Sequence, residues 1–137
     1  MRLLLVLFFF PGSIYSSATN KLPAEKILQV IVDEIGTVSI GRDTVGADNL
    51  ARYIQERLFK SYMGTGKMHS KIKFLKASTN VPDMVAEVVI KEIQDGQRRA
   101  LKELCLQKYR NLFESINKKK QAKLKKQFPV LFQTEYQ

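Results

Sequence analysis

The stretch from Ile27 to Ile40, which reads ILQVIVDEIGTVSI, decides the fold of the chain. Its first part, Ile27–Val32, is mostly β-branched and apolar, which predicts a strand. Residues 33–36 predict a tight turn, because Gly36 accepts the positive φ that such a turn requires. Polar and apolar residues alternate over residues 37–40, so we expect a second strand with one face in water. The two strands together predict a β-hairpin.

A helix and a third strand are expected after the hairpin. Residues 41–46 are interpreted as a loop. Residues 48–60 predict an amphipathic helix that stops in the glycine-rich stretch before Lys67. Residues 71–77 alternate lysines with Ile72 and Phe74, which predicts a strand with one apolar face.

A long helix is predicted to begin at Pro82 and to reach Phe113. Proline suits the first helical position, and Asp83 is favourable at the positive end of the helix dipole. The apolar pattern continues past Gly96. A glycine inside a helix costs about 1 kcal/mol relative to alanine, so we expect a kink or a close packing contact there.

The last part of the chain predicts a basic helix and a short apolar closure. Residues 115–127 are rich in lysine, and Pro129 is expected to end that helix. The apolar cluster at residues 128–132 is expected to pack back onto the body. The whole order predicts an α+β fold, a small two-layer domain of three strands with helices on one face and a basic helical C-terminal extension.

The first 20 residues have the pattern of a targeting segment. Arg2 precedes eight apolar residues, and Pro11, Gly12 and a small-residue stretch follow. This predicts a secretory signal peptide, or the surviving end of a truncated transmembrane anchor, since a complete span needs about 20 apolar residues. Both interpretations place the rest of the chain across a membrane. A buried N-terminal core strand is the structural alternative.

The net charge of +10 is unevenly placed along the chain. From Gly96 to the end there are eleven Lys and Arg against three acidic residues. Such a tail can attract nucleic acid, anionic lipid or an acidic partner, or it can be a solvated helix face. The lysine cluster within residues 118–126 could contact phosphates, although it lacks the interleaved aromatics that stack on bases. Its members are Lys118, Lys119, Lys120, Lys123, Lys125 and Lys126.

We expect no catalytic, cofactor-binding or metal site, and therefore no enzyme. The segment from Gly64 to Lys67 resembles part of a phosphate-binding loop but lacks its first glycine and its final Ser or Thr. His69, the only histidine, is interpreted as a surface loop residue, and Cys105 as a buried, inert thiol. A secreted hydrolase that uses a serine, His69 and an acid is a weaker alternative. The partner-binding residues stay unassigned.

The order of motifs over residues 26–132 resembles the periplasmic domain of the ExbD/TolR family of biopolymer transport proteins. The resemblance rests on the hairpin, on residues 49–58, on residues 72–77 followed by Asn80, Val81 and Pro82, and on two tail segments. Those segments are residues 95–101 and residues 126–129. Family members carry an N-terminal transmembrane helix with an aspartate in the proton path, whereas this sequence has no acid before Glu25. Asp83 also stands where the family commonly has an aromatic residue.

The resemblance implies an accessory subunit of an energy-coupling complex of the TonB–ExbB–ExbD type, driven by the proton-motive force. The implied partners are an ExbB/TolQ-like proton-channel subunit and a TonB-like protein, and the implied form is a homodimer. We then expect the chain at the inner membrane, with the domain on the periplasmic side and no nucleic acid bound. The alternative is a small basic nucleic-acid-binding protein that uses the lysine cluster.

Overall fold

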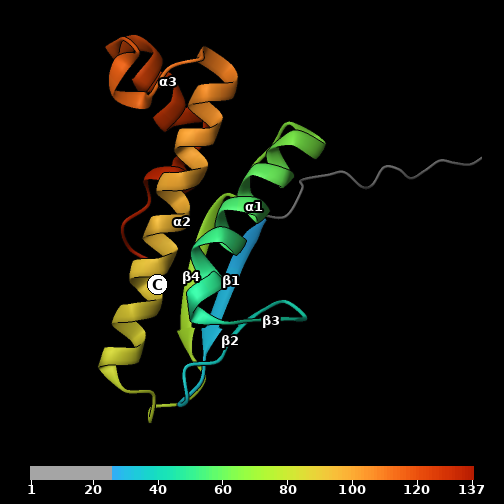
Figure 1. Ribbon diagram of the computed structural model, residues 1–137, viewed down its shortest axis with the longest axis vertical. Helices are drawn as coiled ribbons and strands as arrows, with labels where there is room; N and C mark the ends of the chain where they lie inside the picture. The colour runs from blue at the N-terminus through green and yellow to red at the C-terminus, as the bar shows by residue number, and fades with distance from the viewer. Residues whose placement is uncertain (1–25) are drawn as a thin grey trace, which may run out of the picture.

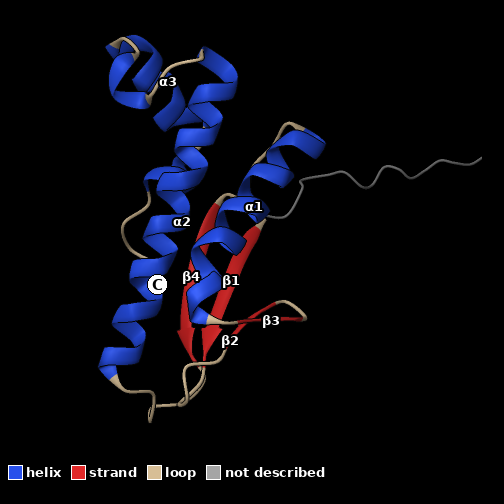
Figure 2. Cartoon of the chain, viewed as in Figure 1, coloured by secondary structure: helices blue, strands red, loops and turns tan. Residues whose placement is uncertain are grey.

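The computed structural model describes residues 26–137, and the expectation for the first 20 residues lies outside them. The described chain is a small α+β domain, as the sequence predicts, and it has a four-stranded mixed sheet and three α-helices (Figures 1 and 2). The elements in order are β1 (Ile27–Val32), β2 (Val38–Ile40), β3 (Asp43–Val45), α1 (Ala47–Thr65), β4 (Lys71–Lys76), α2 (Asp83–Tyr109), the short 3-10 helix η2 (Phe113–Ser115), α3 (Lys118–Gln127) and the 3-10 helix η3 (Pro129–Phe132).

The sheet has the strand order β3-β2-β1-β4. β1 pairs antiparallel with β2, and Gly36 takes a φ of 89° in the turn between them, which confirms the hairpin. β4 lies on the other side of β1 and runs parallel to it. A parallel pair needs a crossover connection, which α1 supplies.

β3 corrects the expectation of three strands, because residues 41–46 were predicted to form a loop. Gly41 takes a φ of 63°, and Ile40 pairs with Asp43 across a two-residue turn. A glycine of positive φ at the first turn position is typical of a tight hairpin turn. The strand is only three residues long and buries only Val45, so alternation could not reveal it.

α1 and α2 cover one face of the sheet. The side chains that point toward the helices are buried in alternation along the central strands: Leu28, Val30 and Val32 from β1, and Ile72 from β4. On the other face Ile27 is 41% exposed and Lys71 is exposed. The second layer is therefore one pair of helices, packed against each other and against the sheet.

α2 continues through Gly96 because this glycine lies against α1. A Cβ atom at Gly96 would lie 2.6 Å from Ile54 Cβ and 2.8 Å from the carbonyl oxygen of Ala51. Real Cβ atoms do not approach so closely, so only glycine allows the two helices to come this near. The predicted close packing contact is confirmed.

The C-terminal segment, residues 128–136, packs onto both α2 and β4. Phe128, Val130 and Leu131 are buried, which confirms that the apolar cluster returns to the body. The Phe74 amide of β4 donates to the Tyr136 carbonyl over 2.7 Å, and the Gln133 side chain exchanges two hydrogen bonds with the Ile72 backbone. The segment therefore supplies hydrogen-bond partners to the backbone groups on the outer edge of β4, as a further strand would.

A buried glutamine on α2 holds this segment in place. The Tyr136 hydroxyl donates to Gln97 Oε1 over 2.6 Å, and Gln97 Nε2 donates to the Val130 carbonyl over 2.6 Å. Gln97 is 3% exposed, so all of these groups are paired inside the protein. Pairing of this kind is required, because an unpaired buried polar group costs about 1–3 kcal/mol.

Helix ends differ from the expected bounds for local reasons. α1 passes through Gly64 and ends at Gly66, which takes the left-handed conformation with a φ of 76°. α2 ends at Tyr109, before Phe113, with Arg110 in the left-handed conformation. α3 begins at Lys118, three residues later than predicted, because the Asn117 side chain accepts a hydrogen bond from the Lys120 amide and caps the helix.

Replacing Gly96 by alanine is expected to lower the free energy of unfolding by about 2 kcal/mol or more, because the new methyl group must push α1 away. Gly64→Ala is the matched control: it also lies in a helix, and a Cβ there would meet nothing within 4 Å. That control is expected to leave stability unchanged or to raise it by up to about 1 kcal/mol. Urea denaturation of both variants measures the difference, and equal stabilities would contradict the packing described for Gly96.

Candidate functional site: the two ends of the domain

The long axis of the domain has two chemically different ends (Figure 1). β1 and β4 run from the middle of the long axis, where the described chain begins, toward one end, and α1 and α2 run back. The half of the molecule away from that end carries Lys26, the C-terminal turns of α1 and α2, and α3, and we call it the basic end. The opposite end carries the β1–β2 turn and the start of α2, and we call it the apolar tip.

Large hydrophobic side chains are exposed at the apolar tip. Ile35 in the turn is 87% exposed, and Met84 and Val88, one helical turn apart on α2, are 76% and 48% exposed. Val85 of α2 lies next to the turn, because a Cβ atom placed on Gly36 would lie 4.0 Å from Val85 Cγ1. Met84 and Val88 also line a shallow hollow of about 310 Å³. Exposed apolar groups that gather in this way are typical of protein-binding surfaces.

A hollow of about 250 Å³ lies at the basic end, and we call it the basic pocket. It is lined by the residue before β1, by residues from the second half of α1 and by one from the loop before β4: Lys26, Arg57, Lys60, Ser61 and His69. Three of these side chains are cations, and none is an acid. The pocket therefore attracts negative charge.

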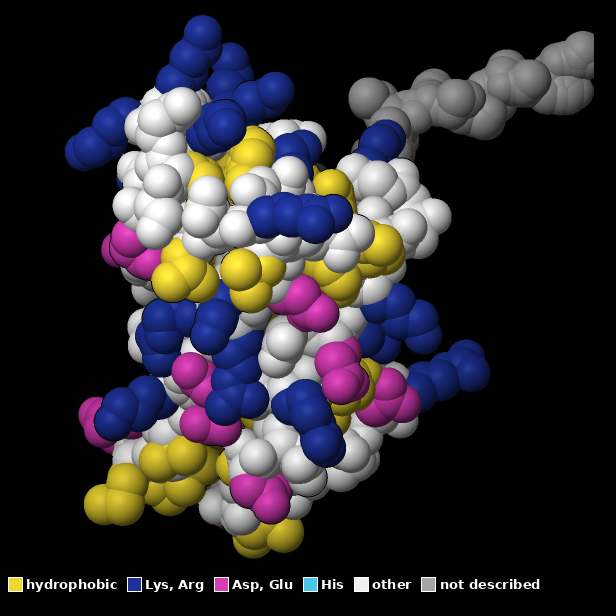
Figure 3. Space-filling view, turned by 45° about the horizontal axis from the view of Figure 1, so that its top comes forward, with side chains coloured by type: hydrophobic (Ala, Val, Ile, Leu, Met, Phe, Trp, Pro, Cys, Tyr) yellow, Lys and Arg dark blue, Asp and Glu magenta, His cyan; other side chains and the backbone are white. Residues whose placement is uncertain are grey.

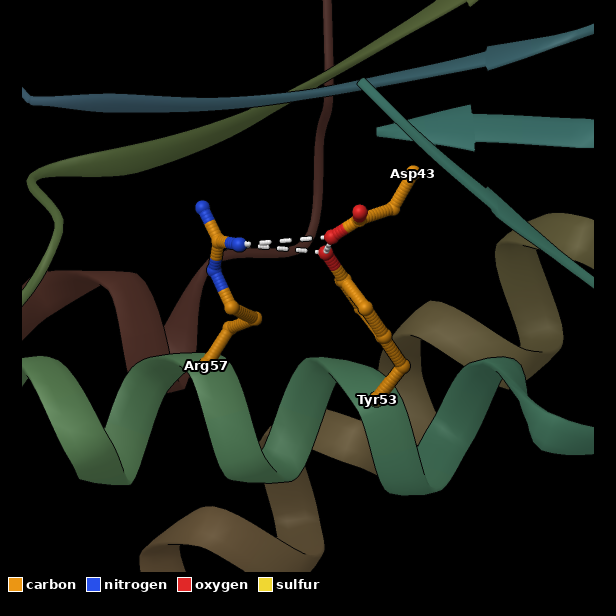
Figure 4. A network of polar contacts seen from close by, with 3 residues as sticks. All are labelled: Asp43, Tyr53 and Arg57. Carbon is orange, nitrogen blue, oxygen red and sulfur yellow. Dashed lines mark hydrogen bonds and ion pairs between the residues drawn. The ribbon is translucent and has the colours of Figure 1, made fainter. Parts of the chain in front are cut away.

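Arg57 is held beside the basic pocket by a polar network that joins α1 to β3 (Figure 4). The Tyr53 hydroxyl donates to Asp43 Oδ2, and Arg57 Nη1 lies 3.1 Å from that hydroxyl and 3.8 Å from the same carboxylate oxygen. Burial, followed by the hydrogen bond to Asp43, raises the pKa of Tyr53. The second terminal nitrogen of Arg57 points away from the network.

His69 is not a surface residue, which corrects the expectation from the sequence. The side chain is 5% exposed, and its Nδ1 atom is buried with no hydrogen-bond partner among residues 26–137. Burial, and then the charges of Lys26 and Arg57, lower the pKa of His69 to about 4. The imidazole is therefore neutral at pH 7. Its neighbours Lys67, Met68 and Ser70 have no apolar pattern, so nothing in the sequence signals this burial.

A serine lies beside His69, but the two are not arranged as a nucleophile and its base. The Ser61 hydroxyl donates to the Lys67 carbonyl over 3.0 Å and accepts from Lys26 Nζ over 3.1 Å. A catalytic serine would donate to the histidine, which an acid would orient. Because no Asp or Glu lines the pocket, the described geometry gives no support to the hydrolase alternative.

The other residues that could have taken part in catalysis or ligand binding have structural roles. The segment from Gly64 to Lys67 ends α1, whereas a phosphate-binding loop precedes the N-terminus of a helix. Cys105 is buried as predicted, and burial raises its pKa, so the thiol stays protonated. Within residues 26–137, His, Cys, Asp and Glu side chains do not gather in groups of three or more that could hold a metal ion.

The lysine cluster forms the surface of α3 at the basic end. All six lysines of this ten-residue helix are exposed, and Leu124 is its one buried residue. Lys120 Nζ lies 5.1 Å from the centre of the Tyr109 ring, and Lys125 Nζ lies 5.9 Å from that of Phe132. Figure 3 shows Lys and Arg side chains gathered at the upper end of the molecule. The basic end therefore carries both a pocket and an outward cationic face.

Comparisons with protein-family models, with curated proteins and with solved structures each found no match for this chain. In the part of the chain from residue 26 onward, the helices are all too short or too polar to cross a membrane.

His69 is expected to make the protein less stable as the pH falls from about 6.5 to about 4. In this range the unfolded chain binds a proton on the imidazole and the folded protein, facing Lys26 and Arg57, does not. The loss amounts to at most about 3 kcal/mol. Urea denaturation of wild type and His69→Leu between pH 7 and pH 4.5 isolates this contribution, because the carboxylates titrate alike in both proteins. If the free energies of unfolding of the two proteins change in parallel with pH, the contribution of His69 is refuted.

Proposed function

We propose that the chain is a non-catalytic accessory subunit of an energy-coupling complex of the TonB–ExbB–ExbD type, which uses the proton-motive force to support transport across the outer membrane. Its partners are an ExbB/TolQ-like proton-channel subunit and a TonB-like protein. The N-terminal residues hold it at the inner membrane, and the folded domain lies on the periplasmic side. In this role the domain works by binding other proteins.

The observation that carries this proposal is the position of the apolar tip. It lies at the end of the long axis opposite α3, and β1 runs toward it from Lys26, where the described chain begins near the middle of that axis (Figure 1). A domain held at its N-terminal end presents the other end to partners that reach it from a distance. Ile35, Met84 and Val88 give that end exposed apolar area of the kind found at the centre of a protein–protein interface, with charged residues around it: Asp33, Glu34, Asp83, Glu87 and Lys91.

The resemblance to the ExbD/TolR family supports the proposal at the level of element order, from the hairpin to the long helix. Asp83, which stands where an aromatic residue is common, is exposed and forms an ion pair of 3.1 Å with Lys76. The Asp83 carboxylate adds a charge beside Met84. We therefore place the centre of the partner surface on Met84 and Val88 of α2 and on the turn between β1 and β2.

The proposed homodimer has to use surfaces other than the β4 edge, which residues 133–136 already cover. Among residues 26–137, the other sheet edge belongs to β3, which offers only three residues. The uncovered sheet face is wider and includes Ile27 and the partly exposed Ile31 and Leu75. We therefore expect the dimer contact to lie on this face.

Val88→Asp is expected to abolish the recovery of a TonB-like or channel-subunit partner after crosslinking in cells and purification of the chain. The substitution places a charge in the apolar tip, where desolvating it opposes binding. Leu106→Asp is the matched control, since Leu106 lies on the same helix and is 45% exposed, against 48% for Val88. Both variants should fold, and the control should keep its partners.

Two outcomes contradict the proposed function. One is equal recovery of partners by the two variants, which would remove the apolar tip from the interface. The other is a wild-type protein found in the cytoplasmic fraction with no partner from a membrane complex.

The second candidate function, nucleic-acid binding, is favoured by the six exposed lysines of α3. If they contact phosphates, the logarithm of the affinity falls steeply with the logarithm of salt concentration. Exchanging Lys119 and Lys123 for glutamine should then reduce that slope by about 2. Absence of binding at low salt rejects this function and leaves the lysines as a solvated face.

A further inference from the structure

We infer that the basic pocket binds a phosphate group, carried either by a small soluble anion or by a phospholipid headgroup. The binding groups are the cations Lys26, Arg57 and Lys60, with Ser61 and His69 completing the wall. No function considered above uses this pocket.

The three cations converge from separate parts of the chain. Arg57, Lys60 and Ser61 share one face of α1, since residues three and four apart are neighbours on a helix. Lys26 joins them from the residue before β1, and its ammonium group donates to Ser61 Oγ over 3.1 Å. Like charges held this close repel one another, and a bound anion removes that repulsion.

The arginine is positioned before any ligand arrives. Asp43 and Tyr53 hold Nη1 on one side, and the second terminal nitrogen is directed away from them (Figure 4). Asp43 offsets one of the three positive charges, so among the described residues Lys26 and Lys60 leave the site with an excess of about two, which attracts the charged oxygens of either phosphate ligand. Among the described residues, Lys60 has no ion pair.

His69 gives a second, independent indication of a ligand. Its Nδ1 is the one buried side-chain nitrogen or oxygen atom without a partner in residues 26–137. A buried unpaired polar atom in a native structure calls for a missing partner, such as an ordered water or an ion. A neutral imidazole in the pocket wall adds a polar group without adding to the repulsion among the cations.

The chemistry of the wall favours phosphate over a carboxylate. Two ammonium groups and a guanidinium fork from separate parts of the chain line the hollow, and several separate donors suit the oxygens of a tetrahedral anion. A carboxylate is planar and is satisfied by one bidentate arginine. The phospholipid source rests on the proposed membrane attachment, because the pocket is lined by Lys26, the residue at which the described chain begins. Binding of soluble phosphate does not depend on that proposal.

The single histidine of the chain makes the test direct, because the imidazole signals in an NMR spectrum belong to His69 alone. The full chain is held in a neutral maltoside detergent and titrated with inorganic phosphate at constant ionic strength and pH 7. We expect a saturable shift of the His69 signal.

Lys60→Gln should weaken binding about tenfold or more, as expected for one lost charge-assisted hydrogen bond. The control Lys119→Gln removes the same charge outside the pocket and should bind as wild type does.

A second titration distinguishes the two sources of phosphate. Phosphatidylglycerol is added to the detergent, with a neutral galactolipid that lacks phosphate as the control. A shift that requires Lys60 and occurs with phosphatidylglycerol assigns the pocket to a headgroup, and a shift with inorganic phosphate alone assigns it to a soluble anion. No shift in either titration, or one that Lys119→Gln weakens as much as Lys60→Gln does, overturns the inference. Failure of partner capture by the apolar tip would leave these results unaffected.

Discussion

The middle of α2 is the point on which the rest of the structure depends. Gly96 faces α1 there and lets that helix approach to van der Waals contact. The next residue, Gln97, binds the C-terminal segment through Val130 and Tyr136. Because the same segment also covers the edge of β4, two adjacent residues of one helix connect both helices, the sheet and the tail.

This arrangement separates two kinds of surface along one axis. β1, β4, α1 and α2 run roughly along the long axis, so the lysine-bearing α3 and the apolar tip lie at opposite ends (Figure 1). The proposed function uses the two ends differently: the apolar tip meets protein partners, and the basic end lies near the membrane, where its cations can meet anionic groups. A nucleic-acid-binding role would use only α3 and would leave the exposed Ile35, Met84 and Val88 unexplained.

The sequence predicts most of this fold because its signals are local. The β-branched run of β1, the alternation in β2 and β4, the glycine of the hairpin turn and the apolar pattern of α2 each act within one element. β3 was missed because three residues are too few for a pattern, and the start of α3 was misplaced because the Asn117 cap was not recognised. The burial of His69 could not be predicted, because it depends on the packing of Lys26 and α1 around a polar loop. The basic pocket joins residues separated by up to 43 positions, from Lys26 to His69, and only the fold brings them together.

Hydrogen exchange at the Ile72 and Phe74 amides tests most directly whether the tail is docked as described. Both amides belong to an edge strand and are protected only by Gln133 and Tyr136. If the hydrogen bonds of Gln97 keep the tail docked, the free energy of opening measured at these two amides should be close to that of the core amides of Ile54 and Ile93. Exchange as fast as that of an open strand edge would contradict the account, since the tail would then be undocked and β4 free to pair with another chain.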